Sequence, residues 1–392
     1  MSVISMTINP IQPIAIDTQK DYSRYFIQTS GLGFYTASDN SQTQQAITGE
    51  NHQALQIVKI EGLVHQLIQD KTILFKVKNN GNGKVIISHQ ALLDSFKQLI
   101  EHDHSRLIQA SFPIHRFNPY VELFFKHFTE ERQWQFKPLF GSSQNLSEKK
   151  SLLNLLNDWV NALRAEAHSP AFKKIIDNAN RLLTKNHKSL LSYIHRVFEQ
   201  HARLLVLRVD FGYRLKPRCS VTQADLMTEY QQAKKDYQHF VNNQKGNRLF
   251  EYLVGHVWKL EYGLQKGFHY HLILFFDGSK VRQDITLAQQ IGEYWQTIIT
   301  QGRELYFNCN AKKHEYKYLG IGMINHHDTE LRNNLNRAAG YLIKIDHFAR
   351  LSAKSIHRNF GKGIIKQSNI GYTGKRGRPR QHESFNDSCC LN

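Results

Sequence analysis

The sequence of 392 residues has few cysteines and no long apolar run, and both absences narrow the class of protein. The four cysteines, Cys219, Cys309, Cys389 and Cys390, form no C-x-x-C pair, which argues against a disulfide framework and a cysteine zinc site. No run of about 18 apolar residues occurs, and the N-terminus lacks the basic, apolar and small-residue order of a secretory signal. We expect a globular cytoplasmic protein with no membrane partner.

Acidic residues are too few in the second half of the chain to balance its lysines and arginines. Residues 1–180 carry 18 Lys and Arg against 16 Asp and Glu, so residues 181–392 hold +16 of the total charge of +18. This positive charge favours nucleic acid over a membrane as the partner. Nucleic-acid phosphates release counterions on binding, and no basic amphipathic helix is evident in the sequence. The alternative is a protein with a merely basic surface.

The pattern of the chain predicts three parts. Residues 1–184 form a mixed region, partly helical, whose role the sequence does not reveal. Within it, an apolar stripe of Leu152, Leu155, Trp159 and Leu163 predicts a helix at 147–167. Residues 185–352 alternate between strand and helix patterns, and residues 353–392 form a basic tail that we expect to be flexible.

The middle part gives the clearest order of elements. We expect strands at 202–211, 254–263, 268–276 and 318–325, and helices at 222–243, 284–302 and 328–351. This order, β-α-β-β-α-β-α, predicts an α+β fold: a central antiparallel sheet with split β-α-β (ferredoxin- or RRM-like) topology and one further C-terminal helix. With helices against one face, the other face would be free for a substrate.

Two histidines interrupt the apolar strand at 268–276. Side chains alternate along a strand, so His269 and His271 share a face and can chelate a divalent metal. With 21 histidines, chance alone supplies roughly one such pair, so packing or solvent exposure is the alternative. A three-residue turn closed by Gly267 in the left-handed conformation would place Glu261 opposite His269 as a third ligand. Two imidazoles and a carboxylate leave open positions on Mg²⁺ or Mn²⁺.

The last predicted helix offers a nucleophile. Tyr341 and Lys344 are three residues apart and Arg337 lies four residues before Tyr341, so the three share one helix surface, a cationic setting for a phenolate. Tyr213 and Tyr372 also precede a lysine by three residues, but both fall in predicted loops. The alternative is a tyrosine half-buried against the sheet.

These motifs carry a family resemblance. A His-hydrophobic-His strand followed by a Tyr-x-x-Lys helix resembles the HUH endonuclease superfamily of rolling-circle replication initiators and relaxases. The segments "GFHYHLILFFDG" and "AAGYLIK" look most like inovirus-type replication proteins of filamentous phages and prophages. The resemblance covers about residues 185–350. It implies that His269 and His271 bind the metal, that Tyr341 attacks DNA and that Lys344 positions the substrate, with Glu261 as third ligand.

The basic tail adds a possible DNA contact. Residues 354–380 hold eight Lys and Arg and no acid, including "GKRGRPR" at 374–380. This segment resembles an AT-hook, which would place Lys375, Arg376, Arg378 and Arg380 on DNA. A solvated tail that only touches phosphates is the alternative.

Together these features predict a site-specific single-strand DNA nickase and ligase that starts rolling-circle replication through a 5′-phosphotyrosine intermediate. Its expected partners are single-stranded or origin DNA, with a host replication helicase and polymerase as further candidates. Alternatives are a non-catalytic DNA-binding regulator with the same fold, and an HUH transposase or relaxase. No helicase P-loop (G-x-x-x-x-G-K-[ST]) is present, which argues against a large relaxase-helicase.

Overall fold

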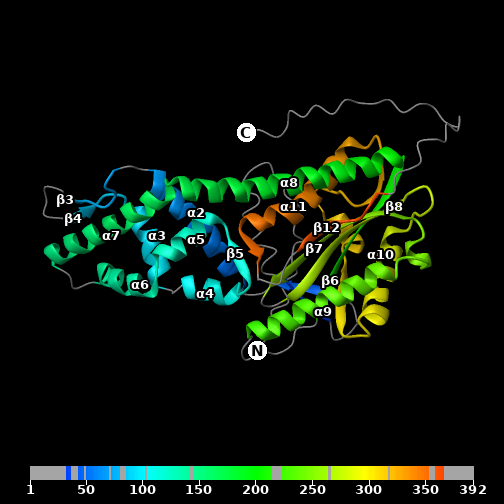
Figure 1. Cartoon of the computed structure of the whole chain (residues 1–392), viewed down its shortest axis with the longest axis horizontal. Helices are drawn as coiled ribbons and strands as arrows, with labels where there is room; N and C mark the ends of the chain where they lie inside the picture. The colour runs from blue at the N-terminus through cyan, green and yellow to red at the C-terminus, as the bar shows by residue number, and fades with distance from the viewer. Residues whose placement is uncertain are drawn as a thin grey trace.

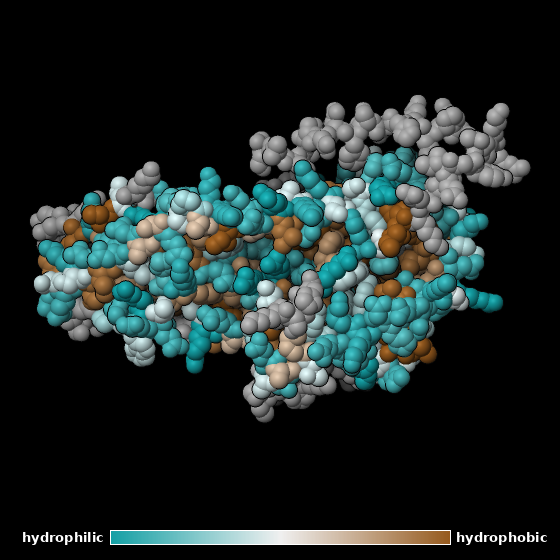
Figure 2. Space-filling model, viewed as in Figure 1, coloured by the Kyte–Doolittle hydropathy of each residue, from teal (hydrophilic) through white to brown (hydrophobic). Residues whose placement is uncertain are grey.

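The computed structural model shows an α+β protein, mostly helical, with antiparallel sheets. It describes residues 32–36, 43–47, 50–69, 72–79, 85–101, 104–141, 145–213, 222–263, 266–316, 318–352 and 358–365. Within these ranges no helix combines the length and the apolar character needed to cross a membrane. On the face seen in Figure 2 the surface is largely hydrophilic, with apolar side chains scattered among polar ones.

The N-terminal region is a layer of helices with short hairpins. Its elements are β1 (Leu32–Thr36), β2 (Thr43–Ile47), α2 (Glu50–Gln69), β3 (Val77–Asn79), β4 (Val85–Ile87), α3 (Gln90–Glu101), α4 (His104–Ser111), β5 (His115–Phe117), α5 (Pro119–His127), α6 (Glu130–Phe136), η1 (Lys137–Phe140), α7 (Leu146–Ala167) and α8 (Pro170–Gln200). Aromatic rings fill its core, where Phe96, Phe128 and Phe136 pack around Trp159. Such packing in staggered, edge-on pairs stabilises a core beyond simple burial.

The helix predicted at 147–167 is confirmed as α7. In a capping box at its start, the backbone N–H groups of Asn145 and Glu148 each donate to the side chain of the other residue. Its apolar stripe packs inward, with Trp159 and Leu163 buried.

The C-terminal region is built on one large sheet. Its elements are β6 (Arg203–Tyr213), α9 (Gln223–Asn242), η2 (Arg248–Phe250), β7 (Leu253–Gly263), β8 (Gly267–Asp277), α10 (Asp284–Tyr294), the π-helical η3 (Trp295–Ile299), β9 (Glu304–Asn308), η4 (Cys309–Glu315), β10 (Gly322–Asn325), α11 (Thr329–Lys344), η5 (Ile345–His347), β11 (Ala349–Leu351) and β12 (Phe360–Lys362). The strands follow the order β10-β6-β8-β7-β12, all antiparallel, and β9 also pairs with β6.

Three differences from the predicted elements come from long-range pairing. β9 and β12 were not expected as strands, and β12 falls in the part of the chain that we expected to be a flexible tail. The helix predicted to reach residue 351 ends at Lys344, and the chain then turns through η5 into β11, which pairs with β5 of the N-terminal region. Strands of three to five residues carry too short a pattern to be recognised without their partners.

Helices cover both faces of this sheet, contrary to our expectation of one free face (Figure 1). One face packs under α9 and α10 through residues such as Leu207, Tyr270 and Phe240. The other face packs under α8 and α11 through residues such as Val206, Phe275 and Leu342. Burial on both sides explains why β6 and β8 are apolar along almost their whole length.

Helix α8 joins the two regions. It is continuous through residues 184 and 185, where the sequence predicted a domain boundary. Its first turn places Phe172 in the N-terminal core, and its last turns place Leu190 to Phe198 against the sheet. Figure 1 shows α8 extending beside both regions.

Candidate metal centre and its surroundings

The β7–β8 hairpin sets the register of the site. Gly263 pairs with Gly267 and Glu261 pairs with His269, as the sequence predicted. Gly267 has φ of 63°, a left-handed conformation that a residue with a side chain adopts only with strain. The turn therefore places Glu261 on the same face as both histidines.

Glu261, His269 and His271 converge on one point. Their ligand atoms all lie within 4.8 Å of one another, and no other group of three His, Cys, Asp or Glu in the described part of the chain meets this criterion. Oε2 of Glu261 lies 3.3 Å from Nε2 of His271 and 3.6 Å from Nε2 of His269. Two imidazole nitrogens and a carboxylate oxygen at these separations fit a divalent cation with open positions.

The backbone fixes the orientation of His269. Its Nδ1 donates to the carbonyl oxygen of Gly267 at 3.1 Å, and because a carbonyl can only accept, this nitrogen carries the proton. The lone pair of Nε2 then points toward Glu261. Burial lowers the pKa of His269 to about 4, so the ring is in the neutral form that a metal requires.

His271 lies between two carboxylates. Its Nδ1 is 2.8 Å from Oδ1 of Asp210, the residue directly opposite on β6, although the pair is not aligned as a hydrogen bond. Burial alone would lower the pKa of His271, but Asp210 and Glu261 outweigh it and raise that pKa to about 9. The positive charge of the imidazolium thus partly balances the charge of the two carboxylates. A metal ion would have to displace the proton of His271.

The two carboxylates beside His271 are held ionised. Burial would raise the pKa of Glu261, but the two histidines keep it well below its usual range. The pKa of Asp210 is lowered in the same way, because His271 and Arg208 outweigh the effect of burial. Sequence reasoning missed Asp210; the available signal was an aspartate inside the largely apolar strand "RLLVLRVDF".

A buried ion pair lies on the same face of β7, two residues before Glu261. Lys259, 1% exposed, contacts Asp346 of η5, with Nζ and Oδ1 2.5 Å apart. Burial raises the pKa of Asp346, and Lys259 opposes that rise. Because Asp346 follows directly after α11, this pair ties the end of that helix to the strand that carries Glu261.

The N-terminal region also reaches the site. His115 of β5 lies with its ring centre 6.2 Å from that of Tyr262, near enough to Glu261 and Lys259 to interact electrostatically. Burial lowers the pKa of His115 to about 3, so its ring is neutral. Nε2 of His347 in η5 lies 2.8 Å from Oε1 of Glu61 in α2. His115 therefore brings the N-terminal region next to the triad, and the Glu61–His347 contact joins that region to η5.

The structure buries the triad that we expected on an open face. The side chains of His269 and His271 are 4% and 9% exposed, and that of Glu261 is 18% exposed. Glu261 is thus the member of the triad with the most access to solvent, and a ligand would approach the centre from its side.

Tyr341 and Lys344 lie at the C-terminal end of α11, on the face of the sheet that bears the triad. Tyr341 is buried, at 2% exposure. It precedes Asp346 by five residues, which span roughly 8 Å in helical conformation, so its backbone lies close to the Lys259 pair. The side chain of Lys344 is outside the described residues.

Of the residues expected to contact DNA, only Arg337 is among the described residues. The guanidinium of Arg337 stacks 5.5 Å above the ring of Tyr318. Lys375, Arg376, Arg378 and Arg380 lie outside the described residues.

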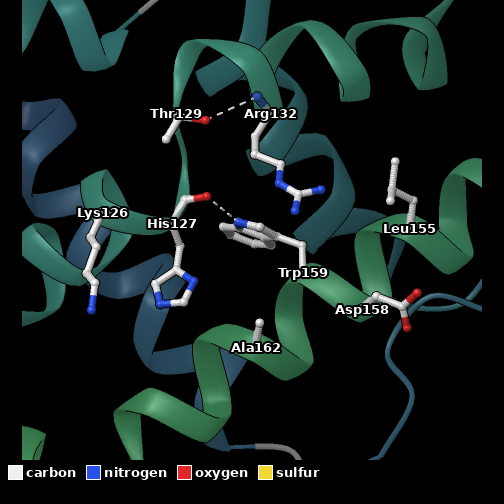
Figure 3. A pocket seen from close by; sticks show the side chains of 8 residues that line it. All are labelled: Lys126, His127, Thr129, Arg132, Leu155, Asp158, Trp159 and Ala162. Carbon is white, nitrogen blue, oxygen red and sulfur yellow. Dashed lines mark hydrogen bonds between the residues drawn. The ribbon is translucent and has the colours of Figure 1, made fainter.

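A separate hollow of about 360 Å³ lies in the N-terminal region (Figure 3). Lys126, His127, Arg132 and Trp159 are among the residues that line it. Its basic side chains already have partners: Glu166 contacts both Lys126 and His127, and Arg132 donates to Gln135. The hollow is therefore far less suited to an anion than its lysine and arginine suggest.

Comparison with known proteins gave one finding. A family model described as the YagK/YfjJ C-terminal domain matches residues 165–363, which include the triad, Tyr341 and β12. Searches of curated proteins and of solved structures found no match.

Proposed function

We propose that this chain, which belongs to the YagK/YfjJ C-terminal domain family, is a metal-dependent endonuclease that nicks and rejoins single-stranded DNA. In this proposal it is an HUH-type enzyme of the rolling-circle kind, acting for a phage or prophage element. Glu261, His269 and His271 would hold Mg²⁺ or Mn²⁺, and Tyr341 would be the nucleophile.

The convergence of Glu261, His269 and His271 carries the proposal. Two buried histidines and a part-buried glutamate with their ligand atoms within 4.8 Å of one another are costly unless they are paired with charge or bind an ion. The donor set of two nitrogens and one oxygen is compatible with Mn²⁺ and Mg²⁺, and it leaves positions for phosphate oxygens. A bound ion would supply positive charge to the scissile phosphate.

The strand order supports the finer fold assignment. The order β10-β6-β8-β7 with antiparallel pairing is the one that a β-α-β-β-α-β chain takes in a split β-α-β sheet. In such a sheet the two central strands are β6 and β8, which carry Asp210 and both histidines.

The protein residues have separate tasks in the proposed reaction. The phenolic oxygen of Tyr341 forms a bond to phosphorus while the bond to the 3′ oxygen breaks, leaving the 5′-phosphate on the enzyme. The phenol loses a proton and the departing 3′ oxygen gains one. Lys344 positions the phosphate, and Asp210 orients His271. Because the phosphotyrosine keeps the energy of the broken bond, a later 3′-hydroxyl can reverse the step.

The burial of the centre favours a second candidate, a DNA-binding regulator that keeps the fold without cutting DNA. The histidines are less than 10% exposed and the phenol is buried. For catalysis, DNA must enter beside Glu261 and displace what covers Tyr341. A regulator would need no such opening.

A covalent-adduct assay separates the two candidates. Incubated with Mn²⁺ and origin-containing single-stranded DNA, the protein is expected to form an adduct that resists denaturation, and Tyr341→Phe is expected to abolish it. Tyr213→Phe and Tyr372→Phe are matched controls that should keep the adduct. An adduct that survives Tyr341→Phe would identify another nucleophile, and DNA binding without any adduct would favour the regulator.

A further inference from the structure

Four cations gather around the outer edge of the large sheet, along β12. The guanidinium of Arg358 lies 5.9 Å from the ring centre of Trp258, and Nζ of Lys234 lies 5.3 Å from it. Nζ of Lys362 lies 5.4 Å from the ring centre of Tyr193. Arg196, one turn of α8 beyond Tyr193, interacts electrostatically with Lys362. We call these four residues, Arg196, Lys234, Arg358 and Lys362, the cationic edge.

Within the described part of the chain, the cationic edge has no acidic partners. Across the described ranges, no carboxylate lies within 4.0 Å of any of the four charged groups. Nζ of Lys362 instead donates to the carbonyl and hydroxyl oxygens of Ser189. The pKa of Lys362 is lowered by burial and by Arg196 and Arg358, and that of Lys234 by burial and by Arg358. Like charges therefore repel one another here, which an anion would relieve.

Backbone packing holds the edge in place. A side-chain carbon at Gly361 would come within 2.5 Å of the indole of Trp258, and one at Gly363 within 2.9 Å of His256. Only glycine lets β12 lie this close to β7, and the two glycines flank Lys362. The cations are thus carried by a well-packed strand and by helices on both faces, α8 and α9, so they form a line around the edge rather than a flat patch.

We propose that the cationic edge binds the sugar-phosphate backbone of single-stranded nucleic acid. A line of cations suits a strand, whose phosphates repeat along one dimension. The edge also lies next to the candidate centre, because Phe360 of β12 pairs with Lys259, two residues from Glu261. The inference adds a binding track to the proposed nuclease, but it concerns affinity and does not depend on Tyr341 being the nucleophile.

Equilibrium binding in the absence of metal tests the cationic edge. Fluorescence anisotropy of a labelled 30-nucleotide single strand is measured in EDTA over a range of salt concentrations, so that nicking does not contribute. The variant Arg196→Gln/Arg358→Gln is expected to weaken binding about tenfold or more at low salt. The slope of log affinity against log salt should fall by about 1.4, since each lost phosphate contact on a single strand removes roughly 0.7.

The matched control is Lys173→Gln/Lys174→Gln, which removes the same charge from exposed positions at the other end of α8. It should leave the slope close to that of the parent protein. Thermal unfolding of both variants checks that they are folded. An equal loss in both variants would mean general electrostatics only and would overturn the proposal, as would an unchanged slope in the edge variant.

Two further outcomes distinguish nucleic-acid binding from membrane binding, and the cationic edge from the nuclease proposal. If the edge variant keeps DNA affinity but loses binding to vesicles containing phosphatidylserine, the edge contacts a membrane and the proposal is wrong. If it loses DNA affinity while an adduct still forms at saturating DNA, the edge is confirmed and the nuclease proposal stands separately. A Tyr341→Phe protein that binds normally but forms no adduct keeps the two proposals distinguishable.

Discussion

One face of the large sheet has two halves of opposite character, although both lie on β6, β7 and β8. In one half, Val206, Val257 and Phe275 pack against α8 and α11. In the other half, Asp210, Glu261 and His271 occupy equivalent inward positions and are also buried, or nearly so. The strands could have continued their apolar pattern there at lower energetic cost. The polar half is therefore best explained by function, and the apolar half by stability.

The largest expected effect comes from removing a candidate ligand. His269→Ala and His271→Ala should each weaken Mn²⁺ binding by at least about 100-fold, because each removes one of the three converging donors. Isothermal calorimetry measures this directly. The exposed His314→Ala serves as control and should bind metal normally. Unchanged binding in His271→Ala would mean that the polar half holds no metal.

A core substitution in the apolar half should lower stability and leave metal affinity unchanged. Phe275→Ala is expected to lower the free energy of unfolding by about 3–5 kcal/mol, because it removes a buried ring that packs against Tyr193. Urea unfolding followed by tryptophan fluorescence measures the loss. Protein that remains folded should still bind Mn²⁺ with parental affinity. A large loss of metal affinity at full folding would contradict the division of the face into two halves.

Asp210→Asn tests whether Asp210 contributes to metal binding in the polar half. The amide keeps the shape of the side chain but removes the charge beside Nδ1 of His271. We expect about 10- to 100-fold weaker Mn²⁺ binding, the usual effect of losing a group that orients a ligand. Metal titrations give the value, and Asp94→Asn, at an exposed position in α3, is the matched control. An unaffected Asp210→Asn protein would show that His271 needs no orienting carboxylate.

The smallest expected effect is on the pH dependence of stability. Burial lowers the pKa of His256 from 6.5 to about 4 in the folded protein. As pH falls from about 6.5 to 4 the unfolded chain binds a proton at this position and the folded protein does not, so His256 contributes a loss of stability over that range. His256→Gln should make stability fall less steeply there, whereas the exposed His314→Gln should not. Urea midpoints between pH 7 and 4.5 measure both slopes, and equal slopes would contradict the assignment.

Local patterns predicted much of the candidate site. The register that pairs Glu261 with His269 followed from a three-residue turn closed by Gly267, because hairpin geometry depends on a few neighbouring residues. The same holds for α7, whose caps and apolar spacing lie within its own sequence. Such features need no knowledge of distant parts of the chain.

Contacts between distant segments were not predictable. Asp210 and Asp346 were missed because each meets its partner across a strand pair or a helix end. His115 and Glu61 belong to a region whose relation to the sheet the sequence did not reveal. The cationic edge escaped notice for the same reason, since its four members come from α8, α9 and β12.

The sequence by itself determined the pair of histidines on one strand face, the glutamate opposite them and the basic excess of the second half, since periodicity, turn chemistry and composition are local properties. Only the tertiary structure decided that both faces of the sheet are covered, that the triad is buried with Asp210 beside it, and that the N-terminal region reaches the same centre. Those outcomes depend on which distant segments pack together, and packing is a property of the whole chain.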